Sequence, residues 1–513
     1  PRQIQVNCRR KRTPPTMICV SIGRGRHRML MQEHAELAKQ DVKLVELRLD
    51  YIRRSVDLGR LLEDRPTPVI ATCRRPTDGG KWRGSERDRI MLLRAAIVNG
   101  ADYVDLEHDI AGQIQRYGST KRIVSYHNFR ETPDDIAKIH EDLTKLDPDI
   151  IKITTMANSP DDNYKVLQLI RSSKIPTIAF CMGDIGTPSR ILCGQAGAPF
   201  TYATFSDERK LAPGQLSYLT MQSLYRYERL NEDSKIFGVV ADPVGHSLSP
   251  TVHNSAFEDI SFNGVYLPFR VPREKFKSFI QQASELGIAG LSVTIPHKEQ
   301  AAEIATHRDQ DVAGIKAANT LIFKDGKIAA YNTDCLAAME CIAKSLKIDL
   351  NDETQSFKGK RMLIMGSGGV ARAIAYGLVR RGAEVTVSGR NINRSEQLAQ
   401  ELKCKSVDWI AKQGIKADVI INGTPVGMHP EVNESPLEKN HIKGNCVIFD
   451  TVYNPEQTLL IKYARELECK VITGTEMFVR QATMQFKLFT GEKTSRSTMM
   501  ERVRRAISPV RYG

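Results

Sequence analysis

Residues 361–371 read Arg-Met-Leu-Ile-Met-Gly-Ser-Gly-Gly-Val-Ala, an apolar run that leads into a glycine-rich turn and an alanine-rich segment. The pattern predicts a strand over Arg361–Met365, a tight turn and the start of a helix. Glycines at the turn would let a pyrophosphate approach the amino end of that helix, where N–H groups favour an anion. The stretch therefore predicts an α/β domain of the Rossmann type that binds a dinucleotide. Its candidate cofactor residues are Gly366, Gly368, Gly369, Val370 and Ala371.

The next predicted strand, Glu384–Ser388, bears on the kind of dinucleotide. A carboxylate at the end of this strand would bind the 2′-hydroxyl of an NAD ribose, and the sequence has none there. Arg390, Asn391 and Arg394 follow instead, and a guanidinium suits a 2′-phosphate. The predicted cofactor is therefore NADP, used as NADPH, rather than NAD.

Upstream of the glycine-rich turn, residues 236–335 carry a further alternation of strands and helices. The segment 242–254 follows its first strand, and a Ser-Pro step there predicts a helix with Pro250 at its first position. Ser249 is interpreted either as the N-cap of this helix or, together with Ser247, as a hydroxyl that binds a carboxylate. The predicted strands are Ile236–Val240, Gly264–Phe269, Gly290–Val293 and Ala318–Phe323.

Polar side chains accompany the later strands of this region as well. Thr294 and Lys298 come soon after the strand that ends at Val293, and Asn319 and Asp334 come later. Each is an ordinary loop residue when taken alone. Together they supply what the reduction of a ketone on a polyol needs, namely a cationic proton donor, a carboxylate that holds it, and amide and hydroxyl groups for the substrate hydroxyls.

The chain up to residue 228 contains short apolar runs separated by amphipathic stretches, at intervals of roughly 20 to 35 residues. Strands that alternate with helices predict parallel βα units, and eight such units predict a closed (β/α)8 TIM barrel. An open, doubly wound sheet is the alternative, because a count of strands does not establish closure. In both folds ligands bind at the carboxyl ends of the strands. The runs are Met17–Ile22, Leu44–Leu49, Val69–Cys73, Tyr103–Leu106, Ile123–Tyr126, Ile150–Ile153, Thr177–Phe180 and Tyr202–Phe205.

Lys152 stands alone among β-branched neighbours in one of these runs and would face either water or the mouth of the barrel. Burial beside other cations would lower the pKa of such a lysine and leave a neutral amine that can attack a ketone. The resulting iminium would accept the electron pair that is left when a proton is removed from the neighbouring carbon. His127 ends the preceding run, so we expect both side chains at the same rim, where the imidazole would act as acid and base.

Arginines near further strand ends indicate a pocket for an anion. Glu46, Arg48 and Asp50 alternate along one predicted strand and so share one face of it. Charges that face a barrel interior are costly unless they pair with one another or with a ligand. Arg74 ends the next strand and Arg190 follows the seventh, and this recurrence favours a carboxylate-binding site.

The composition is typical of a globular protein that binds small anions. The 513 residues are 41% hydrophobic and 26% charged, with a formal net charge of +14. The only dense basic cluster, Arg9 to Arg12, lies in a predicted tail over residues 1–16 that lacks the apolar core of a secretory signal. We therefore expect anionic small molecules as partners, and neither nucleic acid nor a membrane.

Two further features bear on the cellular location of the protein. No apolar run approaches the ~18 residues that would cross a bilayer. The ten cysteines are scattered without a Cys-x-x-Cys pair, which favours reduced thiols in the cytoplasm and gives no support for a metal site. A processed plastid form is the alternative to a cytoplasmic protein.

The amino-terminal part resembles the type I 3-dehydroquinate dehydratases over about residues 17–228, a family of barrels. This resemblance implies that Lys152 forms a Schiff base with the substrate and that His127 is the acid and base. The chain departs from the family at Asp78, where glutamate is usual, and at Leu211, where a substrate-contacting serine is common. The substrate would be held by Glu46, Arg48, Arg74, Arg190 and Gln215. The matching motifs are Glu46-x-Arg48-x-Asp50, Arg74 with Gly79-Gly80, His127 with Lys152, Met182-Gly183 through Arg190, and Ala212-Pro213-Gly214-Gln215.

Residues 236–510 resemble the shikimate dehydrogenases. This resemblance implies a catalytic pair of Lys298 and Asp334, with Gly474 near the nicotinamide. Shikimate would be bound by Ser247, Ser249, Thr294, Asn319 and Gln481. The matching motifs are Thr294-x-Pro296-x-Lys298, Asn319-Thr320, Asn332-Thr333-Asp334, Gly366-x-Gly368-Gly369, Asn422-x-Thr424, Tyr453-Asn454-Pro455 and Gly474-x-x-Met477-x-x-x-Gln481.

The two resemblances together predict an α/β chain with two successive activities. It would dehydrate 3-dehydroquinate to 3-dehydroshikimate and then reduce that product to shikimate, in the order of the plant-type bifunctional enzymes. One alternative is a fusion with a quinate/shikimate dehydrogenase. Another is a non-catalytic regulator that senses these metabolites, although such a regulator need not keep Lys152, His127, Lys298 and Asp334. The expected segments are a tail (1–16), the barrel (17–230), a substrate-binding domain (234–345), the Rossmann domain (356–475) and C-terminal helices that return to the substrate-binding domain (476–513).

Overall fold

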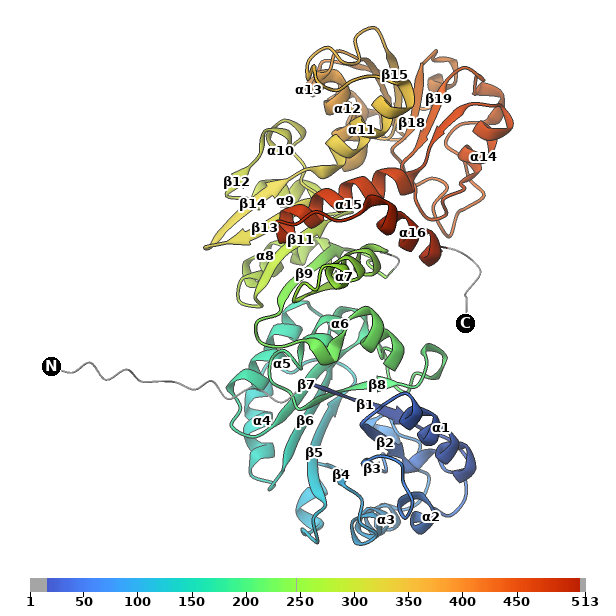
Figure 1. Cartoon of the computed structure of the whole chain (residues 1–513). Helices are drawn as coiled ribbons and strands as arrows, with labels where there is room; N and C mark the ends of the chain where they lie inside the picture. Colours follow the sequence, from blue (N-terminus) through green and yellow to red (C-terminus); the bar gives the residue numbers. More distant parts are fainter. Residues whose placement is uncertain (1–15, 246, 508–513) are drawn as a thin grey trace, which may run out of the picture. The chain divides into compact units, whose positions relative to one another are not determined.

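The computed structural model describes residues 16–245 and 247–507 (Figure 1). The basic cluster at Arg9 to Arg12 and almost all of the predicted tail lie outside these residues. The chain divides into two compact units. The first consists of the residues up to Lys235 together with Asn263–Val271, and the second of Ile236–Phe262 together with the residues from Pro272 onward.

The first unit contains an eight-stranded sheet with the order β7-β6-β5-β4-β3-β2-β1-β8. Its ladders are parallel, and β8 pairs with β1, so the sheet curls into a nearly closed barrel. A doubly wound sheet would reverse its strand order at a switch point. The TIM-barrel prediction is therefore confirmed and the open alternative is wrong. The strands are β1 (Met17–Ile22), β2 (Leu44–Arg48), β3 (Val69–Thr72), β4 (Tyr103–Glu107), β5 (Lys121–Asn128), β6 (Ile150–Met156), β7 (Thr177–Met182) and β8 (Phe200–Thr204).

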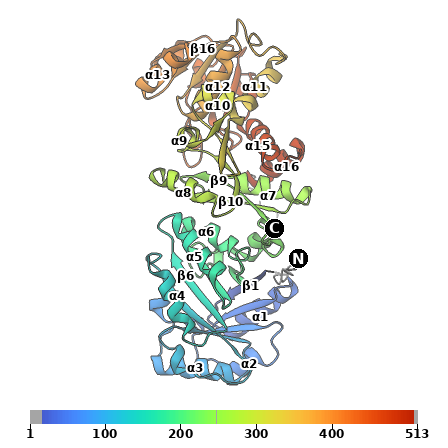
Figure 2. The same cartoon turned by 90° about the vertical axis from the view of Figure 1, so that its left-hand side faces the viewer.

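Helices cover the outside of this barrel (Figure 2). The helix α3 (Glu86–Val98) begins where the Ser85 side chain accepts a hydrogen bond from the Asp88 N–H, with Glu86 and Asp88 in its first turn beside the positive end of the helix dipole. The other barrel helices bury apolar side chains against the strands in the same way. They include α1 (His27–Lys39), α2 (Leu58–Leu62), α4 (Ile136–Thr144), α5 (Asp161–Ser172) and α6 (Gly183–Leu192).

The second sheet is mixed and has the order β10-β9-β11-β13-β14-β12. The parallel pair of β9 (Lys235–Ala241) and β11 (Ile288–Val293) gives the expected βα pattern. An antiparallel hairpin of β13 (Thr320–Lys324) and β14 (Lys327–Tyr331) follows, because Asp325 and Gly326 both adopt positive φ angles of the kind that a tight hairpin turn requires. The remaining strands are β10 (Gly264–Arg270) and β12 (His307–Arg308).

The third sheet is parallel and has the order β17-β16-β15-β18-β19-β20. Its central strand β15 (Arg361–Met365) lies between β16 and β18, where the strand order reverses, and the glycine-rich turn leaves β15 at this switch point. The Rossmann prediction is confirmed. The other strands are β16 (Glu384–Ser388), β17 (Lys405–Val407), β18 (Val419–Asn422), β19 (Val447–Asp450) and β20 (Lys470–Ile472).

The chain then continues into two helices, α15 (Gly474–Thr490) and α16 (Arg496–Ile507). The helix α15 packs along α11 (Thr333–Leu346) and against β11 and β13, while α16 packs on α15 and on α7 (Ser249–Asp259) (Figure 1). The carboxyl-terminal helices thus lie on the part of this unit that contains the second sheet. Among the described residues no helix has the length and apolar character needed to cross a membrane.

Candidate active sites

Seven predicted side chains from six segments of the chain meet in one pocket, called here the barrel pocket. Strand β2 contributes two of them and β5 and β6 one each, while the other three come from the segment after β3, from helix α6 and from the loop after β8, so the pocket lies toward the carboxyl ends of the strands. This is the end of a TIM barrel at which ligands bind. The seven residues are Glu46, Arg48, Arg74, His127, Lys152, Arg190 and Gln215.

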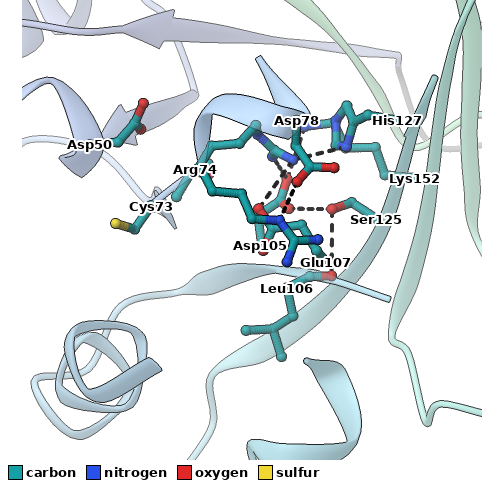
Figure 3. Close-up of polar contacts among 12 residues, drawn as sticks. Asp50, Cys73, Arg74, Asp78, Asp105, Leu106, Glu107, Ser125, His127 and Lys152 are labelled. Carbon is teal, nitrogen blue, oxygen red and sulfur yellow. Dashed lines mark hydrogen bonds and ion pairs between the residues drawn. The ribbon is translucent and has the colours of Figure 1, made fainter. Parts of the chain in front are cut away.

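Lys152 belongs to a buried charge cluster around Asp105 (Figure 3). Its Nζ is 2.9 Å from Asp105 Oδ2 and 3.7 Å from Glu46 Oε1, and it lies 4.0 Å from the centre of the Tyr202 ring. Its nearest charged neighbours are thus two carboxylates. Burial favours the neutral form of Glu46, but the charges of Lys152 and Arg48 outweigh this and lower the pKa of Glu46.

Arg74 joins Asp105 to His127 (Figure 3). Its Nη2 lies 2.7 Å from Asp105 Oδ2, and its Nη1 lies 2.9 Å from His127 Nδ1 and 3.6 Å from Glu107 Oε1. Asp105 therefore contacts two cations and also accepts a hydrogen bond of 2.6 Å from the Ser125 hydroxyl. Burial alone would raise the pKa of Asp105, but Arg74 and Lys152 lower it far below its usual range.

The contact with Arg74 fixes the state of His127. Burial and the charge of Arg74 lower the pKa of His127 well below 6.5, so the imidazole is neutral near pH 7. A guanidinium can only donate, so Nδ1 accepts and the ring proton lies on Nε2. Asp78 does not take part in this contact, because its Oδ2 accepts a hydrogen bond of 2.5 Å from Arg75 Nε.

Arg48 is held by Asp50 through two hydrogen bonds of 3.0 and 2.9 Å. The expectation that Glu46, Arg48 and Asp50 alternate along one strand is wrong for Asp50. The strand β2 ends at Arg48, and Asp50 lies in a short 3-10 turn (Leu49–Tyr51), where its Oδ2 also accepts the Lys81 N–H. The turn brings the carboxylate back onto the guanidinium and orients it bidentately.

Arg190 has no carboxylate partner among the described residues, although it is only 1% exposed. Its Nη1 donates to the carbonyl oxygen of Tyr202 at 3.3 Å, its guanidinium lies 4.3 Å from the centre of the Phe180 ring, and its Nε has no hydrogen-bond partner within that part of the chain. Burial lowers the pKa of Arg190 to about 10. A buried cation without a counter-charge is suited to bind an anionic ligand.

A second pocket lies in the second unit and contains the predicted pair of Lys298 and Asp334. Lys298 Nζ donates to Asp334 Oδ2 at 2.6 Å, and both residues are buried. Asp334 stands in the first turn of α11, which begins where the Asn332 side chain accepts a hydrogen bond from the Cys335 N–H. The pocket is lined by Ser247, Ser249, Thr294, Lys298, Asn319, Asp334, Val370, Gly474 and Gln481, and also by Ser292, Tyr453 and Gln485.

A network of amides and hydroxyls forms one wall of this second pocket. The Asn319 amide donates to Thr333 Oγ1 at 2.9 Å, and its Oδ1 accepts the Thr333 N–H at 2.9 Å. Gln485, one turn beyond Gln481 on α15, donates to the Asn319 carbonyl at 3.0 Å and accepts from the Ser292 hydroxyl at 2.8 Å. The network holds these polar groups rigidly toward a polyhydroxylated ligand.

The serine segment differs in one respect from the sequence interpretation. The helix α7 begins at Ser249 itself, with Pro250 as its second residue, and no side chain caps it, so Ser249 is not an N-cap. The Ser247 hydroxyl accepts the Ser249 N–H at 3.3 Å. Both serine side chains line the pocket.

The glycine-rich turn fits a dinucleotide. Gly366 has a φ angle of +120°, and a Cβ atom there would lie 2.8 Å from the Gly423 carbonyl oxygen. The helix α12 (Gly369–Arg380) begins after Gly368 without any side-chain cap, so its first N–H groups face the turn. Of the predicted cofactor residues, Val370 and Gly474 line the second pocket, Gly366 and Gly368 lie in the glycine-rich turn, and Gly369 and Ala371 lie in the first turn of α12.

The predicted 2′-phosphate residues follow β16 and are exposed. The Asn391 side chain accepts the Arg394 N–H at 3.1 Å and so caps α13 (Ile392–Leu402). Arg394 Nη2 lies 3.1 Å from Glu299 Oε1, and Arg390 stands beside them at the strand end. Two guanidinium groups at this place suit a phosphate.

Several residues of the sites were not singled out in the sequence. Asp105 and Glu107 alternate in β4 as Glu46 and Arg48 do in β2, and this alternation of acids in an apolar strand was a signal available in the sequence. Gln485 could have been found from its spacing to Gln481, which places both on one face of a helix. The described residues contain no group of three or more His, Cys, Asp or Glu side chains that could hold a metal ion.

Family models match the chain in four stretches. A type I 3-dehydroquinase model matches residues 18–232, and a shikimate dehydrogenase substrate binding domain model matches residues 239–321. An NADP oxidoreductase model matches residues 361–452, and a shikimate 5′-dehydrogenase C-terminal domain model matches residues 474–504.

Whole proteins match as well. The chain is 34% identical over 498 residues to the chloroplastic bifunctional 3-dehydroquinate dehydratase/shikimate dehydrogenase of Arabidopsis thaliana, which covers 93% of this chain and 82% of that protein. It is 35% identical over 285 residues to a shikimate dehydrogenase (NADP(+)) of Caldanaerobacter subterraneus, covering 54% of this chain and 99% of the relative. A crystal structure of a shikimate dehydrogenase in complex with NADP+ matches with a TM-score of 0.51 and 32% identity, covering 54% of this chain and 98% of that chain.

Proposed function

The chain belongs to the family of bifunctional 3-dehydroquinate dehydratase/shikimate dehydrogenases, and from this premise we propose how its two pockets divide the two reactions. The barrel dehydrates 3-dehydroquinate to 3-dehydroshikimate, and the second unit reduces 3-dehydroshikimate to shikimate with NADPH. These are successive steps of the shikimate pathway, which leads to the aromatic amino acids. The observation that carries the proposal is the occurrence in one chain of a buried lysine beside a neutral histidine and of a Lys–Asp pair beside a dinucleotide turn.

The proposed domains follow the same division. The barrel domain spans residues 17–230, the substrate-binding domain 234–345 and the Rossmann domain 356–475, and residues 476–513 return to the substrate-binding domain. The matches to the family models and the packing of α15 on α11 support these limits. In this scheme the product of the first domain is the substrate of the second, within one chain.

In the barrel, five side chains are proposed to bind the substrate before any bond changes. Arg190 takes the carboxylate, because it is a buried guanidinium without a counter-charge. The other four are Glu46, Arg48, Arg74 and Gln215, which surround Lys152 in the barrel pocket. Gln215 Oε1 accepts the Leu211 N–H at 2.7 Å and thereby also holds the loop that follows β8 over the pocket.

Lys152 is proposed as the nucleophile. Its ammonium gives one proton to the neutral His127, and the free amine adds to the ketone carbon of 3-dehydroquinate. The carbinolamine hydroxyl takes this proton back from the histidine and leaves as water, which gives the iminium. His127 then removes a proton from the carbon next to the iminium, and the electron pair passes into the C=N bond. Return of the electrons expels the β-hydroxyl, which takes a proton from the histidine and leaves as water. Hydrolysis of the iminium releases 3-dehydroshikimate and restores the amine.

In the second pocket, the substrate is proposed to lie between the serines and Lys298. Ser247 and Ser249 bind its carboxylate, and Thr294, Asn319 and Gln481 bind its ring hydroxyls. Lys298 donates a proton to the carbonyl oxygen as negative charge develops there, and Asp334, 2.6 Å from the ammonium, keeps it in position. NADPH supplies the hydride when it is bound.

The cofactor is proposed to lie along the glycine-rich turn. Gly366, Gly368, Gly369, Val370 and Ala371 would accept its pyrophosphate, and Arg390, Asn391 and Arg394 its 2′-phosphate. Gly474 and Val370, which line the second pocket, would meet the nicotinamide. The cytoplasm is the proposed location, with a plastid as the alternative that the Arabidopsis relative suggests.

Reductive trapping tests the barrel assignment. Borohydride added during turnover with 3-dehydroquinate reduces an iminium to a stable secondary amine, so mass spectrometry should find the substrate-derived mass on the peptide that contains Lys152. The Lys152→Ala chain should acquire no adduct while it still reduces 3-dehydroshikimate. An adduct of equal yield in Lys152→Ala would overturn the assignment.

A further inference from the structure

Two buried hydroxyl groups in the barrel pocket have no role in the site described so far. Thr154 Oγ1 and the Tyr202 hydroxyl are buried and have no hydrogen-bond partner among the residues that the structure describes. Thr154 is 6% exposed and Tyr202 is 3% exposed, and both line the barrel pocket. A buried polar group without a partner destabilises a protein, so each such group in a native fold calls for an explanation.

The two residues that carry these hydroxyls lie close to Lys152. Thr154 follows Lys152 by two residues on β6 and therefore points to the same face, into the barrel. It is also the register partner of His127 on β5 and of Phe180 on β7. Tyr202 comes from β8, and the face of its ring lies 4.0 Å from Lys152 Nζ.

Other hydroxyls of the barrel interior are partnered, which makes these two exceptional. Ser21 donates to Glu46 at 2.5 Å, Thr72 donates to the same carboxylate at 2.9 Å, and Ser125 donates to Asp105 at 2.6 Å. Those serines and threonines orient the charged groups of the pocket. The hydroxyls of Thr154 and Tyr202 contact none of these charged groups, so both are available to a ligand.

We propose that the Thr154 and Tyr202 hydroxyls form a subsite beside Lys152 that binds hydroxyl groups of the cyclic polyol attached there. The inference rests on the proposed Lys152 site and adds two substrate-contacting residues to it. A hydroxyl both donates and accepts, so it matches another hydroxyl without a change of charge. Sites that hydrogen-bond a substrate hydroxyl discriminate strongly against rings that lack it.

The test compares two neighbouring threonines in the full chain. Thr154→Val keeps the shape but removes the unpartnered hydroxyl, so the thermal transition of the barrel should rise by about 2–4 °C. The same change should lower kcat/KM for 3-dehydroquinate about 3- to 10-fold, because a substrate hydrogen bond is lost. Thr154→Ser should restore most of this loss. Tyr202→Phe should behave as Thr154→Val does.

Thr155→Val is the matched control. Thr155 points to the other face of β6, is fully buried, and shares a hydrogen bond of 2.7 Å with Thr132. Its loss should lower the thermal transition and leave kcat/KM nearly unchanged. The activity of the second unit with 3-dehydroshikimate reports that each variant chain is folded.

The possible results separate the subsite from the site on which it rests. If Thr154→Val and Tyr202→Phe leave kcat/KM unchanged, or if they lower the thermal transition as Thr155→Val does, the subsite is wrong even though borohydride still traps the substrate on Lys152. If the parent chain traps no substrate on Lys152, the proposed function of the barrel fails and the subsite fails with it. A higher transition temperature combined with a lower kcat/KM supports the subsite.

Discussion

Arg74 contacts three side chains at once, which a single guanidinium can do because it offers five donors in a fixed plane. It neutralises Asp105 at 2.7 Å, approaches Glu107 at 3.6 Å and donates to His127 at 2.9 Å. Lysine would supply one point charge and could not hold all three partners in this geometry. The protonation state of His127 thus depends on an arginine that follows β3.

We predict that His127 in the free chain titrates well below pH 6.5, because burial and the charge of Arg74 disfavour the imidazolium. Nuclear magnetic resonance of histidine-labelled protein, with the His127 signal assigned by its loss in His127→Gln, measures this directly. Arg74→Gln should move the midpoint upward, since it removes a positive charge from Nδ1. A midpoint at or above 6.5 in the parent chain would contradict the electrostatic account.

The Lys298–Asp334 pair gives a second prediction at the residue scale. Lys298→Met keeps the length of the side chain but removes the proton donor, so kcat for the reduction of 3-dehydroshikimate should fall by at least about 100-fold, the usual contribution of acid catalysis. The KM should change much less, because the donated proton matters in the transition state. Steady-state kinetics separates the two quantities. An increase in KM with an intact kcat would make Lys298 a binding residue only.

At the scale of elements, the loops that follow β18 and β19 share one buried carboxylate. Asp450 accepts hydrogen bonds from the Asn422 amide at 3.0 Å, from the Val452 N–H at 3.0 Å and from the Thr458 hydroxyl at 2.6 Å. Thr458 in turn caps α14 (Leu459–Glu466). Burial nevertheless raises the pKa of Asp450 to about 6, since no cation compensates its charge.

This raised pKa predicts a dependence of stability on pH. The folded chain holds the Asp450 proton more tightly than the unfolded chain, so the contribution to stability is full below about pH 4 and is lost as the pH rises through about 6. The Asp450→Asn variant lacks this titration. Between pH 4 and 7 the parent should therefore lose about 2 kcal/mol of unfolding free energy relative to the variant.

Urea unfolding of the second unit, followed at several pH values in both proteins, measures this difference. Parallel curves for the parent and Asp450→Asn across that range would show that Asp450 is not protonated in the fold. The barrel transition in the same samples is the internal control, because Asp450 lies outside the first unit.

Strands were predictable from the sequence mainly where both faces are apolar. All eight barrel runs are strands, but β5 and β6 extend past their apolar runs to Asn128 and Met156. The apolar criterion stops there because inward residues such as His127 and Thr154 are polar at the pocket. Prediction from the sequence therefore ends these strands too early at the pocket, where polar side chains stand in place of apolar core residues.

Other features could not be predicted because they depend on tertiary contacts. The strand β13 was predicted as Ala318–Phe323, but its partner β14 was missed, although the turn signal Asp325-Gly326 between them is local. Asp78 and Asp50 have contacts that follow from turns after their strands rather than from strand alternation. Nothing in the sequence spacing indicates that Arg74, and not Asp78, contacts His127.

At the scale of the whole molecule, the two pockets lie in separate compact units. The first pocket is lined by residues between Ser21 and Gln215, and the second by residues between Val239 and Gln485. Because no residue of either catalytic set belongs to the other unit, a substitution in one pocket should leave the chemistry of the other intact. The chain gains a high local concentration of the intermediate without a need for shared residues.

One measurement tests the central claim that a single chain carries two independent active sites. The parent chain, Lys152→Ala and Lys298→Ala are each incubated with 3-dehydroquinate and NADPH, and the products are separated chromatographically. The parent should form shikimate, Lys152→Ala should leave 3-dehydroquinate unchanged, and Lys298→Ala should accumulate 3-dehydroshikimate. An equimolar mixture of the two variants should form shikimate again. If the mixture fails to do so, or if either variant loses both activities while it remains folded, the two-site account is contradicted.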